Sequence, residues 1–469
     1  MNLPVERSQK KFSDGAIKGF LVILAAFVCT YVSIIVASSD VNGLLSIGTV
    51  SVFILGFRFP LVPLITLQIA LFLLPDFFRF SELFLWGSRS LDPKNLVFFS
   101  LIFYSVLYFL QVPRSWTLWK LQPYFRALCL YCLIFVLGAL PDFSIEPALK
   151  NIGLVLGLYL GTFLLIRSEF SARWMIKAFL LIGMCHLSYA LLQFAVFDLE
   201  WLTKDVLFIQ YKVYKEGILQ TFYLSGKTGF FYRHNTFGKF MVMILITLLS
   251  FRPLFQFNWK QHYLQISVFS IGLLLSLSRH SFVGMVCLFS ANILTSGIDS
   301  KKVWQVTIAG ICLLPFLLGP LAHRLESFGS LLALGTVLQD PSMLARIESW
   351  QAVFDLVSKN PLGVGFRGLD GITADSGYVA VTAIAGGPGI LVFLAYWIRV
   401  ILISRLGVSC GSACHYHRFI LLYALTFLVL NLASNSTVFT NFAPCIMVMA
   451  AADKLEVLPM MEKEGNETA

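Results

Sequence analysis

Residues 377–404 read GYVAVTAIAGGPGILVFLAYWIRVILIS and contain a single charged residue, Arg399. A helix needs about 20 apolar residues to cross a hydrocarbon core that is about 30 Å thick, and this stretch is long enough. The run from Gly386 to Gly389, which includes a proline, predicts a kink or an unwound turn in the middle of the span. Broken membrane helices usually border a cavity. The stretch therefore predicts a discontinuous transmembrane helix.

The composition extends this interpretation to the whole chain. Of its 469 residues, 58% are hydrophobic and 13% are charged, and the mean hydropathy of +0.80 is far above that of a soluble domain. These values exclude a soluble enzyme, a nucleic-acid-binding protein and a disulfide scaffold. The net charge of +10 is attributed to loops that set the topology, because no basic run exceeds two residues.

The hydropathy pattern predicts an all-α polytopic membrane protein with about fourteen transmembrane helices, or twelve to fourteen if short spans merge. The first span is expected to be retained, because no cleavage site of a signal peptide follows it. The expected spans are 19–37, 42–57, 59–77, 95–112, 127–140, 151–166, 178–197, 236–251, 262–278, 281–297, 303–321, 377–404, 419–433 and 436–452.

Positive charges alternate from loop to loop, as the positive-inside rule requires. With a cytoplasmic N-terminus, an even number of spans returns the C-terminus to the cytoplasm, where the short acidic tail 453–469 is expected to be disordered. The basic residues of the expected inside loops are Arg58, Arg114, Lys120, Arg126, Arg167, Arg173, Lys177, Arg252, Lys260, Lys301, Lys302, Arg399, Arg405 and Arg418.

Two outer, periplasmic segments are long, at 198–235 and 322–376. In the second, Pro341 in a first helical turn and the stop at Asn360-Pro361 predict an amphipathic helix over 341–358. The expected apolar face is Ile347, Trp350, Phe354 and Val357, and the expected polar face is Glu348, Gln351 and Asp355. The chain thus divides into membrane helices 1–197, loop 198–235, membrane helices 236–321, loop 322–376, membrane helices 377–452 and tail 453–469.

Three outer arginines stand beside apolar helices: Arg233, Arg279 and Arg346. An arginine is costly to hold there without a partner, and its planar guanidinium suits phosphate oxygens. Together they indicate a site for an anionic lipid headgroup. The alternative for each is a side chain that snorkels to ordinary phospholipid.

Three neighbouring residues could serve as a general base near neutral pH: His234, His280 and Asp375. The alternative for the histidines is an anchor at the membrane interface. The alternative for Asp375 is an N-cap of the following helix, and that role could coexist with catalysis.

The cysteines mostly lie in apolar segments and do not form a disulfide pattern. Cys410, Cys414, His415 and His417 are the one cluster with metal-ligand types. Their spacing is too cramped for a tetrahedral site, so no metal is expected.

In order along the chain, several motifs resemble the O-antigen ligase and polymerase family. The resemblance covers about 230–400, and the first 200 residues resemble the family only as a set of membrane spans. The motifs are Arg-His-Asn-Thr-Phe-Gly at 233–238, Ser278-Arg279, Arg346 with Trp350, Pro361 to Gly365, Asp375 to Tyr378, and AGGPGILVF at 385–393.

The resemblance implies a metal-independent, inverting glycosyltransferase of the helical membrane (GT-C-like) class that needs no cofactor. Its substrates would be polyprenyl-diphosphate-linked oligosaccharides at the outer face of a bacterial inner membrane. The family's essential arginines carry over onto Arg233, Arg279 and Arg346 as binders of the donor diphosphate. Fixed cations stabilise the negative charge that a departing diphosphate gains in the transition state.

One departure from the family favours a polymerase. Where the ligases end this loop with a histidine next to asparagine, this chain reads Asp375-Ser376. Asp375, or else His234, would then assist the acceptor sugar, and Trp350 and Tyr378 would stack on sugar rings unless they are interfacial belt residues.

The alternatives are an O-antigen ligase, which would transfer the glycan to an acceptor such as lipid A-core, and a polysaccharide flippase. A flippase predicts two similar halves, which the sequence lacks. The expected partners are the lipid-linked oligosaccharide and the bilayer, with no nucleic acid. The sequence leaves open whether a chain-length regulator binds.

Overall fold

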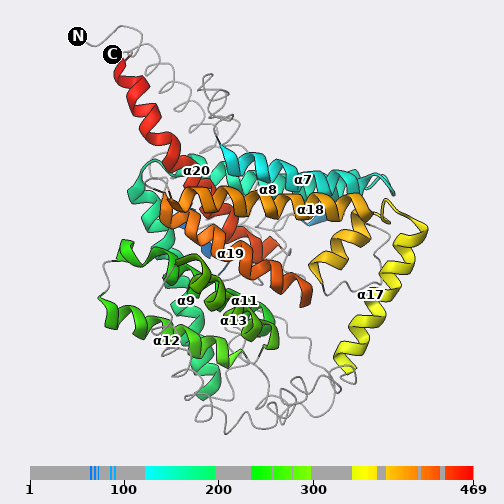
Figure 1. Ribbon diagram of the computed structural model, residues 1–469, viewed down its shortest axis with the longest axis horizontal. Coiled ribbons are helices and arrows are strands. Elements are labelled where there is room, and N and C mark those ends of the chain that lie inside the picture. Colours follow the sequence, from blue (N-terminus) through cyan, green and yellow to red (C-terminus); the bar gives the residue numbers. More distant parts are fainter. Residues whose placement is uncertain are drawn as a thin grey trace, which may run out of the picture.

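We describe a computed structural model of the chain. It describes residues 64–65, 68–69, 72, 85–86, 89–90, 122–195, 234–255, 258–276, 278–296, 341–366, 376–409, 413–433 and 439–467. Nearly all of these residues are helical (Figure 1). The helices are α7 (Pro123–Ala139), α8 (Ile145–Leu165), α9 (Glu169–Ala195), α11 (His234–Phe251), the 3-10 helix η3 (Arg252–Phe255), α12 (Trp259–Leu275), α13 (Arg279–Ser296), α17 (Pro341–Lys359), α18 (Gly377–Ser409), α19 (Cys414–Ala433) and α20 (Phe439–Glu467). Two short antiparallel strands, β1 (Leu85–Trp86) and β2 (Arg89–Ser90), are also present.

The predicted helical architecture is confirmed for the described residues, and it is compatible with a membrane protein. Among the described residues, four helices are long and apolar enough to cross a membrane, and two shorter apolar helices accompany them at Pro123–Ala139 and Ser281–Thr295. The four are Ile145–Leu165, Glu169–Gln193, Asn235–Phe255 and Gly377–Val408. The total of fourteen spans stays a prediction, because 19–37, 42–57, 95–112, 303–321 and most of 59–77 lie outside the described residues, as does nearly all of loop 198–235.

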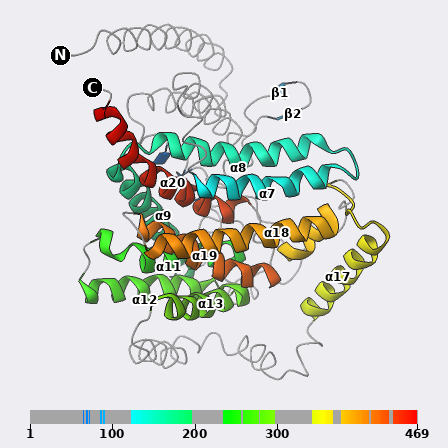
Figure 2. The same ribbon diagram turned by 45° about the horizontal axis from the view of Figure 1, so that its top comes forward.

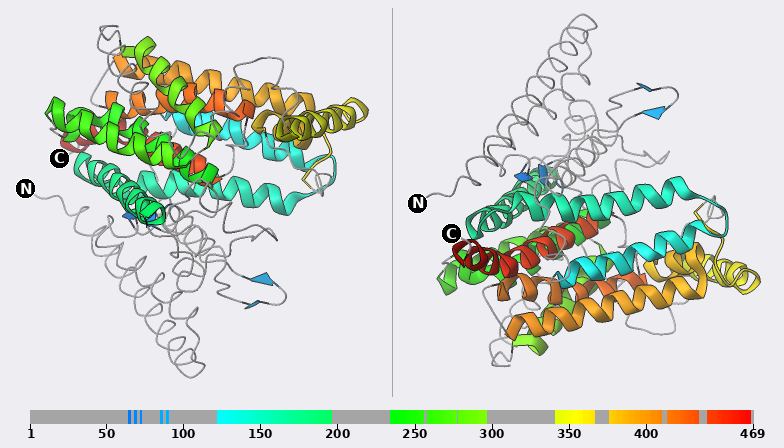
Figure 3. Two further views of the ribbon diagram at one scale, coloured as in Figure 1. Left: turned by 90° about the horizontal axis from the view of Figure 1, so that it is seen from below. Right: turned by 90° about the horizontal axis from the view of Figure 1, so that it is seen from above.

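Most of the helices form a bundle in which α18 runs antiparallel to α7 and α19, whereas α11 and α13 run parallel to each other (Figures 2 and 3). α18 packs against both α7 and α19, and α19 in turn packs against α11, α13 and α20. Aromatic rings join three of these helices at the centre: the ring of Tyr131 lies 5.0 Å from that of Tyr396 and 5.1 Å from that of Phe442. Ring contacts of this kind contribute about 0.5–1.5 kcal/mol each beyond the area that they bury.

The C-terminal tail departs from its expected disorder. α20 continues to Glu467, and its end extends past the other helices (Figure 1). The side chains of Asp453, Leu455 and Val457 are buried. Packing of this stretch against the bundle offsets its polar composition, so it continues the helix.

The amphipathic helix predicted over 341–358 is α17, which begins at Pro341 and ends at Lys359, one residue before Asn360. Its buried face differs from the expected one. Val353 is 1% exposed and packs with Trp350 and Val357 against α18, whereas Phe354 is 56% exposed. Spacings of three and four residues keep side chains on one helix face, and Phe354 is rotated about 100° from Val353.

The predicted break in α18 lies at Gly386, where φ is 61° and ψ is −153°. The segment that follows α17 fills this break. The backbone N–H of Val364 donates to the Ala383 carbonyl (2.9 Å) and that of Gly365 to the Ile384 carbonyl (3.1 Å). In return, the N–H of Gly387 donates to the Pro361 carbonyl (3.1 Å). We call residues 361–366 the clasp.

Glycine is required at two points of the clasp and the break. Gly363 has φ of +85°, and a Cβ there would lie 2.5 Å from the Ile384 carbonyl oxygen. A Cβ on Gly386 would overlap the Pro361 carbonyl oxygen. The two backbones therefore approach each other as closely as only glycine allows.

We expect Gly386→Ala to destabilise the protein by at least about 2 kcal/mol, because alanine opposes positive φ and its methyl group would separate the clasp from α18. Thermal unfolding of the purified protein in detergent measures this. Gly387→Ala is the matched control, because a Cβ there would lie 3.9 Å from the Pro361 carbonyl oxygen. Equal unfolding temperatures for the two variants would contradict the role of the clasp.

Candidate active site

The predicted site residues fall at or near the beginnings of helices. α11 begins at His234, α13 begins at Arg279, and α17 carries Arg346 in its second turn. Arg233 and Asp375 lie outside the described residues, directly before α11 and just before α18. The side chains of His234, Arg279, His280 and Arg346 also lie outside the described part of the chain. Their chemical roles therefore stay predictions, and the structure places their backbone.

The first turns of α11 and α13 touch each other. Gly238 of α11 lies so close to α13 that a Cβ there would overlap the hydroxyl of Ser281 and lie 2.6 Å from that of Ser276. Ser276 directly precedes the turn into α13. This contact brings the helix beginnings that bear His234 and Arg279 side by side.

The beginning of α18 joins the same end of the bundle through α19. A Cβ on Gly284 of α13 would lie 3.0 Å from Leu430, near the end of α19. One residue further on, the backbone carbonyl of Asn431 accepts a hydrogen bond from the hydroxyl of Ser376 (2.9 Å). Ser376 follows Asp375 directly, so the backbone next to Asp375 is fixed against the helix that packs on α13.

α17 reaches this end through the first turns of α18. Its residues Trp350 and Val353 pack against Val379 and Ala383. All views place α17 beyond one end of the bundle (Figures 1, 2 and 3). The described beginnings of α11, α13 and α18 are thus connected through the end of α19, and α17 is attached to them through α18.

The helix beginnings give this end an electrostatic character of their own. The N-terminus of a helix carries about half a positive charge, and its first N–H groups point outward. α11, α13 and α18 all begin here. An anion is stabilised at such a place even before the arginine side chains are considered.

The two predicted sugar-binding aromatics have defined surroundings. The Tyr378 hydroxyl donates to the Leu428 carbonyl (3.0 Å), and its ring meets that of Phe393 edge-on at 5.5 Å. The indole of Trp350 is partly buried, and its Nε1 is buried without a hydrogen-bond partner in the described structure. Stacking of either residue on a sugar stays a prediction.

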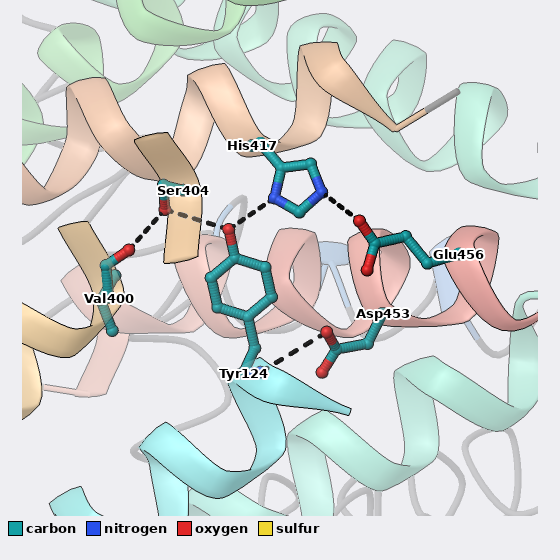
Figure 4. Close-up of polar contacts among 6 residues, drawn as sticks. All are labelled: Tyr124, Val400, Ser404, His417, Asp453 and Glu456. Atoms are coloured by element: carbon teal, nitrogen blue, oxygen red, sulfur yellow. Dashed lines mark hydrogen bonds and ion pairs between the residues drawn. The ribbon is translucent and has the colours of Figure 1, made fainter. Parts of the chain in front are cut away.

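The opposite end of the bundle holds a buried polar network that the sequence analysis did not identify (Figure 4). It joins four helices through Tyr124 of α7, Ser404 of α18, His417 of α19 and Glu456 of α20. The Tyr124 hydroxyl lies 2.7 Å from His417 Nδ1 and 3.0 Å from Ser404 Oγ, and His417 Nε2 lies 2.8 Å from Glu456 Oε1.

The network is anchored to the backbone of α18 as well. The Ser404 hydroxyl donates to the Val400 carbonyl (2.7 Å) one turn earlier in the same helix. Each of the four side chains thus contacts at least one group from another helix or from the backbone.

Asp453, one turn before Glu456, caps α7 from a distance. α7 begins at Pro123 without a side-chain cap of its own. The Asp453 carboxylate accepts from the backbone N–H groups of Phe125 (3.1 Å) and Tyr124 (3.5 Å) and from the Tyr159 hydroxyl (2.5 Å). Its oxygens satisfy N–H groups in the first turn of α7 that have no partner within the helix.

The sequence carried one signal of this network. Asp453 and Lys454 follow a long apolar run directly, and both are buried. Charged residues at that point suggested the start of a tail. The partners of Asp453 lie 294 to 329 residues away, on α7 and α8, which no local pattern reveals.

Three members of the Cys/His cluster, Cys414, His415 and His417, lie in the first turn of α19. His417 belongs to the polar network, and Cys414 is a free thiol. Cys410 lies outside the described residues. In the part of the chain that the structure describes, no group of three His, Cys, Asp or Glu residues could hold a metal ion.

A comparison of the sequence with protein-family models and with curated proteins finds no match. What the fold establishes is a helical protein with apolar helices long enough to cross a membrane.

We expect Asp453→Ala to cost about 3 kcal/mol of stability, because it leaves two N–H groups and the Tyr159 hydroxyl buried without an acceptor. Thermal unfolding in detergent measures the loss. Glu169→Ala is the control: Glu169 forms a half-exposed pair with Arg173 (2.7 Å), and such pairs contribute about 0.5 kcal/mol or less. A loss at Asp453 as small as that at Glu169 would show that the cap carries little stability.

Proposed function

We propose that the protein polymerises polyprenyl-diphosphate-linked oligosaccharide repeat units into a surface polysaccharide at the outer face of a bacterial inner membrane. One observation carries the proposal. The helices that carry motifs resembling the O-antigen ligase and polymerase family lie far apart in the sequence, yet contacts join them in series at one end of the bundle: α11 with α13, α13 with α19, α19 with α18, and α18 with α17.

In the proposed reaction, a hydroxyl oxygen of the acceptor repeat attacks the anomeric carbon of the donor sugar. The bond from that carbon to the diphosphate oxygen breaks, and the diphosphate departs with the bonding electrons, which inverts the configuration. Asp375, or else His234, takes the hydroxyl proton. Arg233, Arg279 and Arg346 bind the diphosphate and stabilise its growing charge, in a field that the helix N-termini reinforce.

The proposed orientation places this end outside and both termini in the cytoplasm. At the opposite end, exposed basic residues stand where helices begin or end: Arg126 on α7, Arg167 before α9, Arg173 on α9 and Arg405 on α18. Basic residues flanking membrane helices favour the cytoplasmic side. The polar network of Tyr124 and His417 then lies at the cytoplasmic end.

A transporter fits this arrangement less well. Transporter sites lie near the bilayer midplane between two repeated halves. Here the candidate residues lie at helix ends, and α17 lies beyond the end of the bundle (Figure 2).

We expect Arg279→Ala, Arg346→Ala and Asp375→Ala, tested singly in the native strain, to reduce polymer formation at least 100-fold, because each removes charge stabilisation or proton transfer in the transition state. The measurement is a size-resolving gel of surface glycans with protein levels checked. The expected result is a ladder that collapses to single repeat units, with lipid-linked repeats accumulating.

Lys150→Ala is the matched control, because Lys150 is exposed on α8 and belongs to none of the helices that form the site. It should leave the ladder unchanged. Full-length polymer that stays on its lipid carrier in the site variants would instead indicate a ligase. An unchanged ladder from well-expressed site variants would refute the assigned site.

A further inference from the structure

A lysine is buried between α20 and α8, at the end of the bundle that holds the polar network. Lys454 is 6% exposed, and its Nζ lies 4.7 Å from the ring centroid of Phe163 on α8. The Nζ atom is not completely enclosed, so a ligand can reach it. Lysine is almost never buried this deeply unless a partner balances its charge. The partner of Lys454 is therefore of interest.

The described residues supply no counterion for Lys454. The two nearest carboxylates along α20 are engaged elsewhere. Asp453 accepts from backbone N–H groups of α7 and from Tyr159, and Glu456 contacts His417. Within the described part of the chain, Lys454 forms neither an ion pair nor a hydrogen bond. The face of the Phe163 ring attracts a cation but carries no full negative charge.

The charge that acts most closely on Lys454 has the same sign. Arg167 lies just past the end of α8, four residues after Phe163. Burial, and then the positive charge of Arg167, lower the pKa of Lys454 to about 8, so the ammonium stays mostly protonated at neutral pH. The C-terminus of α8 offers only about half a negative charge. This does not balance a full ammonium charge, so an anion is favoured here.

Exposed aromatic side chains mark this end of the bundle as a membrane interface. Phe170 and Trp174, in the first turns of α9, are 62% and 41% exposed, and their ring centroids lie 6.1 Å apart. Aromatic side chains beside basic ones are typical of the level of the phospholipid headgroups. Phe170 follows Arg167 by only three residues. The anion that Arg167 and Lys454 meet at this level is the phosphate of a phospholipid.

We propose that Lys454 and Arg167 bind the phosphate group of an anionic phospholipid beside the end of α8. The ammonium and the guanidinium donate charge-assisted hydrogen bonds to phosphate oxygens. A headgroup bound there links α20 to α8 and stabilises the contact on which the Asp453 cap of α7 depends. The site lies at the opposite end of the bundle from the candidate active site, so the inference goes beyond the proposed function and does not rest on it.

The test uses the full chain, purified in an uncharged detergent and freed of lipid, at about 0.15 M salt to screen exposed charges. The probes are phosphatidylglycerol, phosphatidylcholine and inorganic phosphate, and shifts of the unfolding temperature give apparent dissociation constants. We expect phosphatidylglycerol to stabilise the wild type more than phosphatidylcholine, whose choline is cationic. Lys454→Met should bind phosphatidylglycerol at least about fivefold more weakly, and Lys454→Arg should retain most of the affinity.

Lys177→Met is the matched control. Lys177 is also a lysine over an aromatic ring, with its Nζ 5.2 Å from the ring of Trp174, but its side chain is exposed. Its loss should change the affinity less than about twofold, because exposed charges are screened. Stability without lipid separates binding from packing. Lys454→Met should then unfold at the same or a higher temperature than the wild type, because it removes an unpaired buried charge.

The probes also distinguish the two sources of phosphate, and either source supports the site if Lys454→Met loses the binding. Preference for phosphatidylglycerol identifies a lipid headgroup, and equal affinity for inorganic phosphate identifies the free ion.

Four results would overturn the inference. Wild-type affinity in Lys454→Met would exclude the lysine from the site, and equal losses in Lys454→Met and Lys177→Met would indicate attraction to a basic surface in general. Equal stabilisation by phosphatidylglycerol and phosphatidylcholine would mean that the hydrocarbon chains act. Unfolding of lipid-free Lys454→Met well below the wild type would show that the lysine has a partner within the protein. None of these results bears on the proposed function, which the glycan ladder tests separately.

Discussion

The backbone hydrogen bonds between the clasp and the break in α18 determine how this end of the bundle is built. In hydrocarbon an unsatisfied N–H or carbonyl costs several kcal/mol, so a membrane helix can be interrupted only where other groups replace the lost bonds. The N–H groups of Val364 and Gly365 satisfy carbonyls at the break, and the Pro361 carbonyl accepts from Gly387. The segment that follows α17 is thereby part of the helix bundle.

This exchange fixes the helix that precedes it. α17 ends at Lys359, so only one residue separates it from the clasp, and it has little freedom to change direction. The clasp is held from the other side as well: Phe366 stacks on Phe135 of α7 with ring centroids 6.5 Å apart. Arg346 therefore stands on a helix whose position depends on α7 and α18 together, and so its placement is part of the fold.

The two ends of the bundle are held by different means. At the clasp the contacts are between backbones and use glycine, whereas the other end uses the side chains of Tyr124, His417, Asp453 and Glu456. Low dielectric strengthens such a network when every member is satisfied. It locks α7, α18, α19 and α20 together, and at the opposite end the hydrogen bonds of Ser376 and Tyr378 to backbone carbonyls near the end of α19 hold α18 against α19.

Sequence reasoning succeeded where one local rule decides the structure. Pro341 and Asn360 marked the ends of α17, and the glycines at 386–389 marked the break in α18, because their backbone chemistry acts within a few residues. It was less accurate where helices continue past the hydrocarbon: α19 begins at Cys414 rather than 419, since polar residues in an interface still form helix. The buried face centred on Val353 and the network of Asp453 depend on which helices become neighbours, and periodicity within one segment does not determine this.

The acidic residues near α11 are unevenly distributed along the bundle. On the described helices that pack around α11, they are Glu169 at the start of α9 and those of α20 from Asp453 onward. They lie at the end of the bundle that holds the polar network of Tyr124 and His417. There they pair with Arg173 and His417 or cap α7. These acidic groups thus stand where basic side chains or free N–H groups give them partners. The beginnings of α11 and α13 hold no acidic side chain of their own, so the partial positive charge of their N–H groups is not offset from within these helices.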